Sequence, residues 1–194
     1  MKTRYSFYRL ATCMLMACVL VSFCGCKYFD NIRTKIRIKY EFGKTIDFSW
    51  PGYEVLSDTL LNGFEISKPL TIVTHINQQL CSSCFGGYLK AAEQYVNFFK
   101  SDSIQMVCIA YPRSVDEIQD ALSFAGVSPE KVRVVYDIDN LYLSSNSIDY
   151  LESGDNAFLL DRNHRILLIG DPVRFHSINE VYTSTILSML RHNE

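Results

Sequence analysis

The sequence lacks the patterns on which several common functions depend. Its 194 residues contain no internal repeat and no low-complexity tract, so one globular domain is the default expectation. The chain has one Cys-x-x-Cys pair, no second pair and no closely spaced pair of histidines, so we assign no metal and no cofactor. Basic residues are also scarce after position 25, because residues 26–194 carry 16 Lys and Arg against 21 Asp and Glu. That balance argues against a nucleic-acid partner.

The N-terminal apolar run is short for a membrane span. It extends over residues 10–23, whereas a bilayer-crossing helix needs ~20 residues. Basic residues precede the run and small residues follow it, which is the order of an export signal. The end of the run, Cys24-Gly25-Cys26, resembles the lipobox of bacterial lipoproteins, although Phe23 stands where an aliphatic residue is usual. The resemblance implies cleavage after Gly25 and lipid on Cys26. An uncleaved anchor helix is the alternative.

Three segments follow from this interpretation. Residues 1–25 are the signal peptide, residues 26–45 are a polar, lipid-anchored tether, and residues 46–194 are the folded domain. The domain is expected in the bacterial cell envelope, outside the cytoplasm and held at a membrane by the lipid on Cys26. Disulfides form and persist in that compartment.

Apolar runs alternate with helical periodicity over the rest of the chain. The expected strands are 43–48, 50–56, 68–76, 103–111, 132–137, 157–161 and 165–170. The expected helices are 88–99, 114–126 and 177–191, with a short polar helix or loop at 139–152. Two Ser-x-x-Glu patterns, which begin at Ser114 and Ser177, predict capped helix starts. This order predicts an α/β domain with parallel central strands and a late antiparallel hairpin.

Cysteine usage singles out one pair. Removal of the signal leaves four of the seven cysteines, Cys26, Cys81, Cys84 and Cys108. Cys108 lies inside an apolar strand and is expected to be a buried, inert thiol. Cys81 and Cys84 are therefore the pair placed to react with each other.

The order of these elements resembles the thioredoxin fold, with Cys-x-x-Cys after a central strand and a β-hairpin before the last helix. The segments TIVTHINQQLCSSC and FLLDRNHRILLIGDP are similar to those of membrane-anchored redoxins of the AhpC/TSA and TlpA type. The resemblance covers residues 43–192. It implies a thioredoxin-like three-layer α/β fold, a mixed central sheet flanked by helices, with thiol–disulfide chemistry.

Position within that fold suggests a role for each cysteine. Unpaired N–H groups at a helix N-terminus favour the thiolate of Cys81, which makes Cys81 the nucleophile. Cys84 is expected to be more buried and to resolve the mixed disulfide. The hydroxyls of Ser82 and Ser83 could donate to sulfur and shift the redox potential, in a direction that the sequence does not determine.

Two nearby features have two interpretations each. His75 stands where thioredoxins carry a buried carboxylate, so it can accept the proton of the second cysteine. Otherwise it is a strand histidine with a satisfied hydrogen bond. Gly86 and Gly87 either leave the surface bare for a partner backbone or serve a flexible first turn and close packing of the helix on the sheet, and we favour the second.

The chain also departs from the family pattern. Alignment of the hairpin places Asp155, followed by Asn156, where thioredoxin-fold oxidoreductases have the cis-proline that shapes the substrate groove. We therefore assign Asp155 and Asn156 to that groove. Leu80 replaces the tryptophan that usually precedes the first cysteine.

The expected function is that of a membrane-anchored thiol–disulfide oxidoreductase. Its partners would be exported protein thiols and disulfides and a redox partner protein. The alternative is a non-catalytic thioredoxin-fold binding module in which Cys81 and Cys84 form a structural disulfide. A peroxidase is not expected, because Thr74 and Gln78 stand where the peroxidatic motif needs Pro and Thr.

Overall fold

Six strands form one mixed sheet in the computed structural model, which describes residues 41–49, 53–55, 66, 68–76, 81–111, 114–148 and 157–192. The strands are β1 (Tyr53–Val55), β2 (Leu70–Ile76), β3 (Ile104–Ala110), β4 (Val132–Asp137), β5 (Ala157–Leu160) and β6 (Ile166–Ile169). Their order in the sheet is β1-β4-β3-β2-β5-β6. β2, β3 and β4 run parallel, and the other pairings are antiparallel. The predicted mixture of parallel centre and antiparallel hairpin is confirmed.

The two central parallel strands are the most buried part of the sheet. Every residue of β2 and β3 is buried, because side chains pack on both faces. Strands in that position need continuous apolar and β-branched runs rather than alternation. The sequences LTIVTHI and IQMVCIA meet that need. Cys108 lies within β3 with no exposed surface, as predicted.

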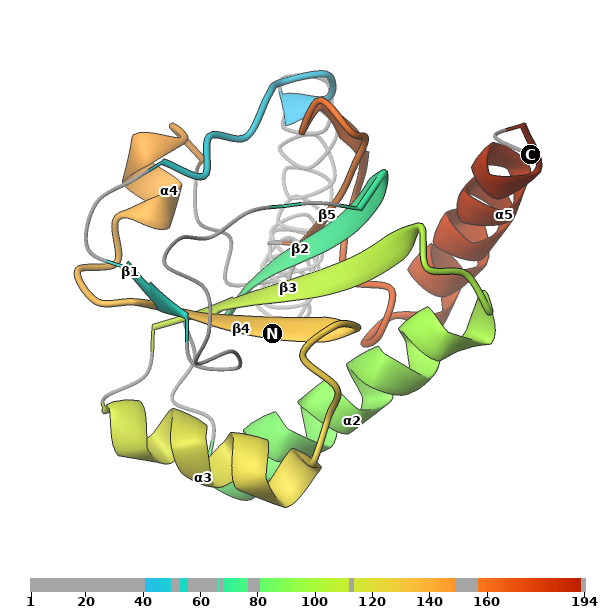
Figure 1. Cartoon of the computed structure of the whole chain (residues 1–194). Helices are drawn as coiled ribbons and strands as arrows, with labels where there is room; N and C mark the ends of the chain where they lie inside the picture. The colour runs from blue at the N-terminus through green and yellow to red at the C-terminus, as the bar shows by residue number, and fades with distance from the viewer. Residues whose placement is uncertain are drawn as a thin grey trace, which may run out of the picture. The chain divides into compact units, whose positions relative to one another are not determined.

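In the described part of the chain, four helices connect or follow the strands (Figure 1). They are α2 (Ser82–Phe98), α3 (Val115–Ala125), α4 (Tyr142–Ser145) and α5 (His176–His192). α2 follows β2, α3 follows β3, and α5 follows the β5–β6 hairpin. Among the described residues, no helix combines the length and the apolarity needed to cross a bilayer.

The two predicted capping patterns have different outcomes. Ser114 caps α3, because its hydroxyl accepts a hydrogen bond from the backbone N–H of Glu117 at 3.3 Å. The prediction for Ser177 is wrong, since α5 already begins at His176. The carboxylate of Asp171 accepts from the N–H groups of Val173 and Arg174, and this turn leads into the helix one residue before the predicted cap.

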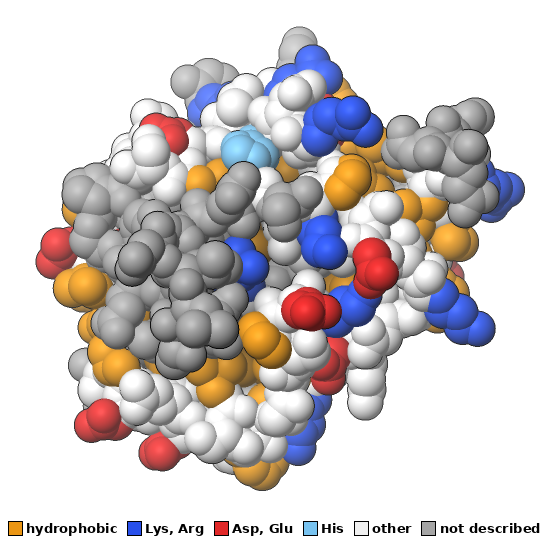
Figure 2. Space-filling view, in the orientation of Figure 1, with side chains coloured by type: hydrophobic (Ala, Val, Ile, Leu, Met, Phe, Trp, Pro, Cys, Tyr) orange, Lys and Arg blue, Asp and Glu red, His pale blue; other side chains and the backbone are white. Residues whose placement is uncertain are grey.

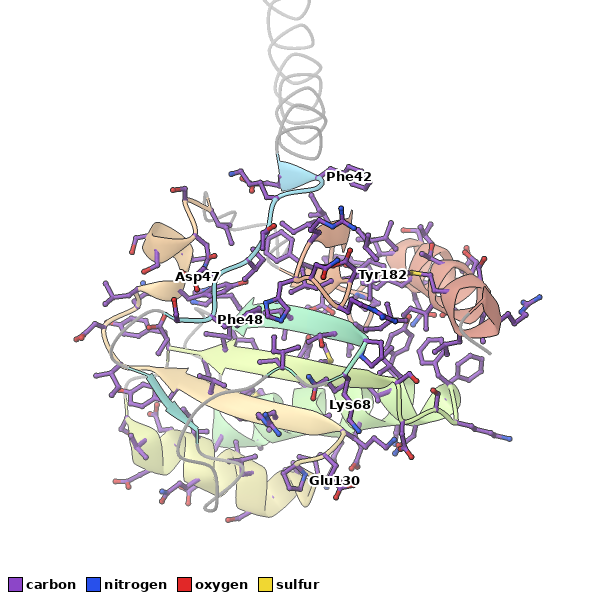
Figure 3. All side chains as sticks on the ribbon, turned by 45° about the horizontal axis from the view of Figure 1, so that its top comes forward. Phe42, Asp47, Phe48, Lys68, Glu130 and Tyr182 are labelled. Carbon is purple, nitrogen blue, oxygen red and sulfur yellow. A yellow bond between two sulfur atoms is a disulfide. The ribbon has the colours of Figure 1, made fainter. Side chains whose placement is uncertain are left out.

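Side chains on the two faces of the sheet form separate hydrophobic clusters. One cluster joins the sheet to α2, α3 and α5, and includes Leu89, Ile118 and Tyr182. The other joins the opposite face to α4 and to the segment before β1, and includes Tyr142 and Phe48. Phe48 packs inward while the neighbouring Asp47 is exposed (Figure 3). The result is the predicted three-layer arrangement, with a sheet between helical layers.

The segment just before Asp47 covers the β6 edge of the sheet. Thr45 forms an isolated antiparallel bridge with Arg165. The N–H of Ile46 donates to the carbonyl of His164, and the N–H of Ile166 donates to the carbonyl of Lys44. Edge strands otherwise present unpaired backbone groups, so this pairing satisfies part of the edge.

The two glycines that follow Cys84 have different environments. A Cβ atom built on Gly86 would lie 2.6 Å from Cδ1 of Phe124 and 2.9 Å from the carbonyl oxygen of Ala121. Gly86 is therefore needed where α2 passes close to α3, which is a packing role against a helix rather than against the sheet. A Cβ on Gly87 meets nothing within 4 Å, and Gly87 is exposed.

These connections define the fold. The strand–helix–strand unit β2-α2-β3 is followed by the hairpin β5–β6 and the helix α5, with β5 paired to β2. The resulting strand order β3-β2-β5-β6 is that of the thioredoxin-like fold, which β4 and β1 extend on one side. The predicted fold class is confirmed.

Candidate redox site

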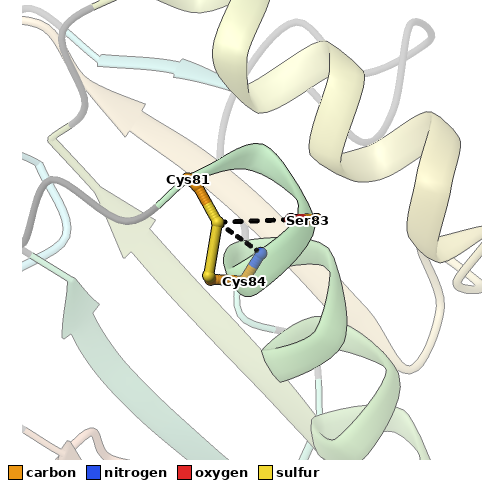
Figure 4. Close-up of a disulfide and its surroundings, with 3 residues drawn as sticks. All are labelled: Cys81, Ser83 and Cys84. Carbon is orange, nitrogen blue, oxygen red and sulfur yellow. Dashed lines mark hydrogen bonds between the residues drawn. A yellow bond between two sulfur atoms is a disulfide. The ribbon is translucent and has the colours of Figure 1, made fainter.

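Cys81 and Cys84 form a disulfide in the first turn of α2 (Figure 4). Their Cα atoms are 5.2 Å apart, within the usual range for a disulfide. Cys81 is the N-cap residue of α2, and its sulfur accepts a hydrogen bond from the backbone N–H of Cys84 at 3.2 Å. The redox-type spacing therefore lies at a helix N-terminus, as the sequence predicts.

Both sulfur-bearing residues are exposed, which corrects the expectation that Cys84 is the more buried. The buried face of α2 begins with Phe85 and continues through Tyr88 and Leu89. Cys84 lies just before that face and shares the exposed side of the turn with Cys81. Both residues are thus in contact with solvent.

The first turn of α2 favours negative charge. It contains no acidic side chain, and the backbone N–H of Cys84 donates to the capping sulfur. The hydroxyl of Ser83 lies 3.2 Å from Sγ of Cys81, and it joins the N–H of Cys84 as a second donor (Figure 4). Such surroundings stabilise a thiolate, which is the form of cysteine that attacks disulfides.

His75 does not lie beside the disulfide side of α2. Its ring stacks on Tyr142 with centroids 5.6 Å apart, on the sheet face opposite the one that α2 covers. Burial lowers the pKa of His75 to about 4, against a smaller opposing effect of the Asp137 carboxylate. Among the described residues, no hydrogen bond joins His75 to either cysteine.

The simpler interpretation of His75, a strand histidine with a satisfied hydrogen bond, is not met within the part of the chain that the structure describes. There neither ring nitrogen has a well-formed hydrogen bond, although the side chain is buried. Asn140 acts to raise the pKa of His75, an effect smaller than that of burial. His75 is thus a buried, neutral and unpaired base at neutral pH.

A polar cluster that the sequence analysis missed ties α2 to the turn between β6 and α5. The hydroxyl of Tyr88 donates to Oδ2 of Asp171 at 3.1 Å, and Nε of Arg174 lies 3.5 Å from the same oxygen. Burial raises the pKa of the Asp171 carboxyl, which its hydrogen bonds partly offset. Tyr88 follows Cys84 by one helical turn, so this cluster anchors the helix just below the disulfide. Tyr88 and Asp171 are 83 positions apart in the sequence, so no local pattern predicts the contact.

Part of the predicted site belongs to segments that the structure does not describe. Asp155 and Asn156 of the predicted groove lie outside the described residues. So do Cys26 and the rest of the predicted signal and tether up to residue 40.

Within the described ranges, no group of three or more His, Cys, Asp or Glu side chains could hold a metal ion. Side chains of both charge signs occupy the face of the molecule in Figure 2.

Comparison with known proteins gives structural likenesses only. No protein-family model matches the sequence, and no curated protein matches it. A thioredoxin-like protein from Bacteroides caccae is similar with a TM-score of 0.49 and 14% identity, over 79% of this chain and 55% of that one. StoA from Bacillus subtilis is similar with a TM-score of 0.43 and 16% identity, over 62% and 88%.

The thioredoxin domain of a thiol-disulfide oxidoreductase from Bacteroides vulgatus is similar with a TM-score of 0.41 and 15% identity. That alignment covers 58% of this chain and 78% of the other. At these values the likenesses do not bear on activity. The strand topology and the Cys81–Cys84 geometry carry the functional proposal.

Proposed function

We propose that the protein is a thiol–disulfide oxidoreductase that uses Cys81 and Cys84. The observation that carries the proposal is the exposed disulfide at the N-terminus of α2, where backbone N–H groups favour a thiolate. A purely structural disulfide would gain little from such exposure, because accessible disulfides are the ones that exchange with thiols.

The proposed reaction has two exchange steps. In the reduced protein the Cys81 thiolate attacks a substrate disulfide, forms a mixed disulfide and releases one substrate thiolate, which takes a proton from water. The Cys84 thiol then loses its proton to water, and its thiolate attacks Cys81 Sγ. This forms the internal disulfide and releases the second substrate thiolate, which also takes a proton from water. The substrate gains two electrons and two protons, and the protein loses them. A partner dithiol reverses these steps and reduces Cys81–Cys84 again.

Reduction of insulin by dithiothreitol tests the chemistry. We expect the wild-type protein to accelerate it, and Cys81→Ser to abolish the acceleration. Cys108→Ser is the matched control, since this thiol is buried and its pKa is raised by burial. No acceleration by the wild type, together with a Cys81–Cys84 disulfide that physiological dithiols cannot reduce, would favour the non-catalytic binding module.

We also propose that the domain works in the bacterial cell envelope, anchored by lipid on Cys26 after cleavage of residues 1–25. The support is the resemblance of Cys24-Gly25-Cys26 to a lipobox after a short apolar run. Its substrates would then be exported proteins, and a separate redox protein would regenerate it.

Metabolic labelling with a palmitate analogue tests the anchor. Cys26→Ala is expected to lose the label and leave the membrane fraction, whereas Cys24→Ala is expected to keep both. Equal labelling of the two variants would refute lipid attachment at Cys26.

A further inference from the structure

The hydroxyl of Ser83 contacts the sulfur that is proposed to react first. Ser83 Oγ lies 3.2 Å from Cys81 Sγ, and both residues are exposed in the first turn of α2 (Figure 4). We propose that Ser83 stabilises the Cys81 thiolate and makes the Cys81–Cys84 pair a stronger oxidant. This inference rests on the proposed oxidoreductase function and assigns a residue that adjusts it.

The direction of the hydrogen bond follows from the bonding of sulfur. In the disulfide, Cys81 Sγ carries no hydrogen, so Ser83 must be the donor and sulfur the acceptor. After reduction and loss of the thiol proton, the same sulfur carries negative charge. A hydrogen bond to a charged acceptor is roughly twice as strong as one to a neutral acceptor.

Ser83 therefore favours the reduced, ionised form over the disulfide. The backbone N–H of Cys84, 3.2 Å from the same sulfur, acts in the same direction. Stabilisation of the reduced form raises the reduction potential of a dithiol–disulfide pair. The contribution of the Ser83 side chain can be removed by mutation, whereas that of the backbone cannot.

The chain offers a matched control one residue earlier. Ser82 is the first residue of α2 and belongs to the same turn, but no hydrogen bond joins its hydroxyl to either sulfur. Ser82→Ala thus removes a hydroxyl and changes helix propensity in the same way as Ser83→Ala, but it removes no contact with Cys81 Sγ. Ser83→Thr keeps the hydroxyl and should preserve the effect.

The first measurement is the pH dependence of Cys81 alkylation in the reduced protein, mapped by mass spectrometry. In Ser83→Ala we expect the midpoint to rise by roughly half to one pH unit, a three- to tenfold weaker acid, because one charge-assisted hydrogen bond is lost at an exposed site. Ser82→Ala and Ser83→Thr should stay near the wild-type midpoint.

The second measurement is the equilibrium constant for disulfide exchange between the Cys81–Cys84 pair and glutathione. It is made at a pH above the alkylation midpoints of all variants. Ser83→Ala should shift it three- to tenfold toward the disulfide, where tenfold corresponds to about 30 mV. An unchanged midpoint and constant in Ser83→Ala, or equal shifts in Ser82→Ala, would overturn the inference. Failure of the wild type to reduce insulin would instead count against the proposed function, and the Ser83 shifts could still be measured.

Discussion

Because His75 is buried, the free energy of unfolding of this domain should decrease as the pH is lowered from neutral to mildly acidic. The residue is 5% exposed, and within the described ranges neither ring nitrogen has a well-formed hydrogen bond. Its pKa is about 4 in the folded protein, against 6.5 ordinarily, because burial disfavours the charged ring. The unfolded chain therefore binds a proton first as the pH falls. The contribution of His75 to the free energy of unfolding is fully present above pH 6.5. It is lost progressively as the pH falls from 6.5 to about 4.

The size of the loss follows from the two pKa values. Linkage between protonation and folding gives a decrease of about 2 kcal/mol in the free energy of unfolding by pH 5, and about 3 kcal/mol by pH 4. For a domain whose total stability is ~5–15 kcal/mol, that is a large share. The raised pKa of Asp171 acts in the opposite direction, so the contribution of His75 must be isolated by mutation.

Urea unfolding at pH 7.5 and pH 5, with the disulfide oxidised, measures this effect. In His75→Leu the loss between the two pH values should be smaller than in the wild type by about 2 kcal/mol. At pH 7.5 its stability should change little, because two unpaired buried nitrogens are replaced by an apolar group of similar volume. The control His176→Gln, at a side chain that is 89% exposed, should keep the wild-type dependence. Equal losses in His75→Leu and the wild type would refute the reasoning.

Two further predictions concern the helices around the site. Gly86→Ala should lower the free energy of unfolding by ~1–3 kcal/mol, because the new methyl group collides with α3, whereas Gly87→Ala, in open space, should raise it by up to ~1 kcal/mol through helix propensity. If Gly87 instead leaves room for a partner backbone, Gly87→Ala will slow insulin reduction despite its added stability. Ser114→Ala should cost ~1 kcal/mol through loss of the α3 cap, and Ser177→Ala, inside α5, well below that. Urea unfolding distinguishes each pair, and equal effects within a pair would contradict the corresponding prediction.

The sheet and its helices could be predicted because their signals are local. β2 and β3 consist mainly of apolar and β-branched residues, and such runs between helical segments specify central parallel strands. Ser114 was predictable as a cap because the bond to Glu117 spans three residues. Ser177 shows the limit of the same pattern, because a carboxylate six residues earlier holds the turn that leads into α5, and the helix already begins at His176.

The surroundings of the disulfide could be predicted only in part. The Cys-x-x-Cys spacing located the pair, since two intervening residues in a helical turn bring the sulfurs together. The contact of the His75 ring with Tyr142 and the hydrogen bond from Tyr88 to Asp171 both join segments that are far apart in the sequence. No periodicity within one segment encodes such contacts.

Exposure of Cys84 changes what the rest of the site must supply. A buried resolving cysteine needs an internal base, whereas water can take the proton from a cysteine at the surface. His75 is neutral at pH 7, is a weak base and contacts Tyr142 on the other sheet face, so the proposed reaction does not need it. The reactivity of the pair is then determined within the first turn of α2, where Ser83 and the N–H of Cys84 both contact one sulfur. His75→Leu should accordingly leave insulin reduction unchanged at pH 7.5 while it alters the pH dependence of stability.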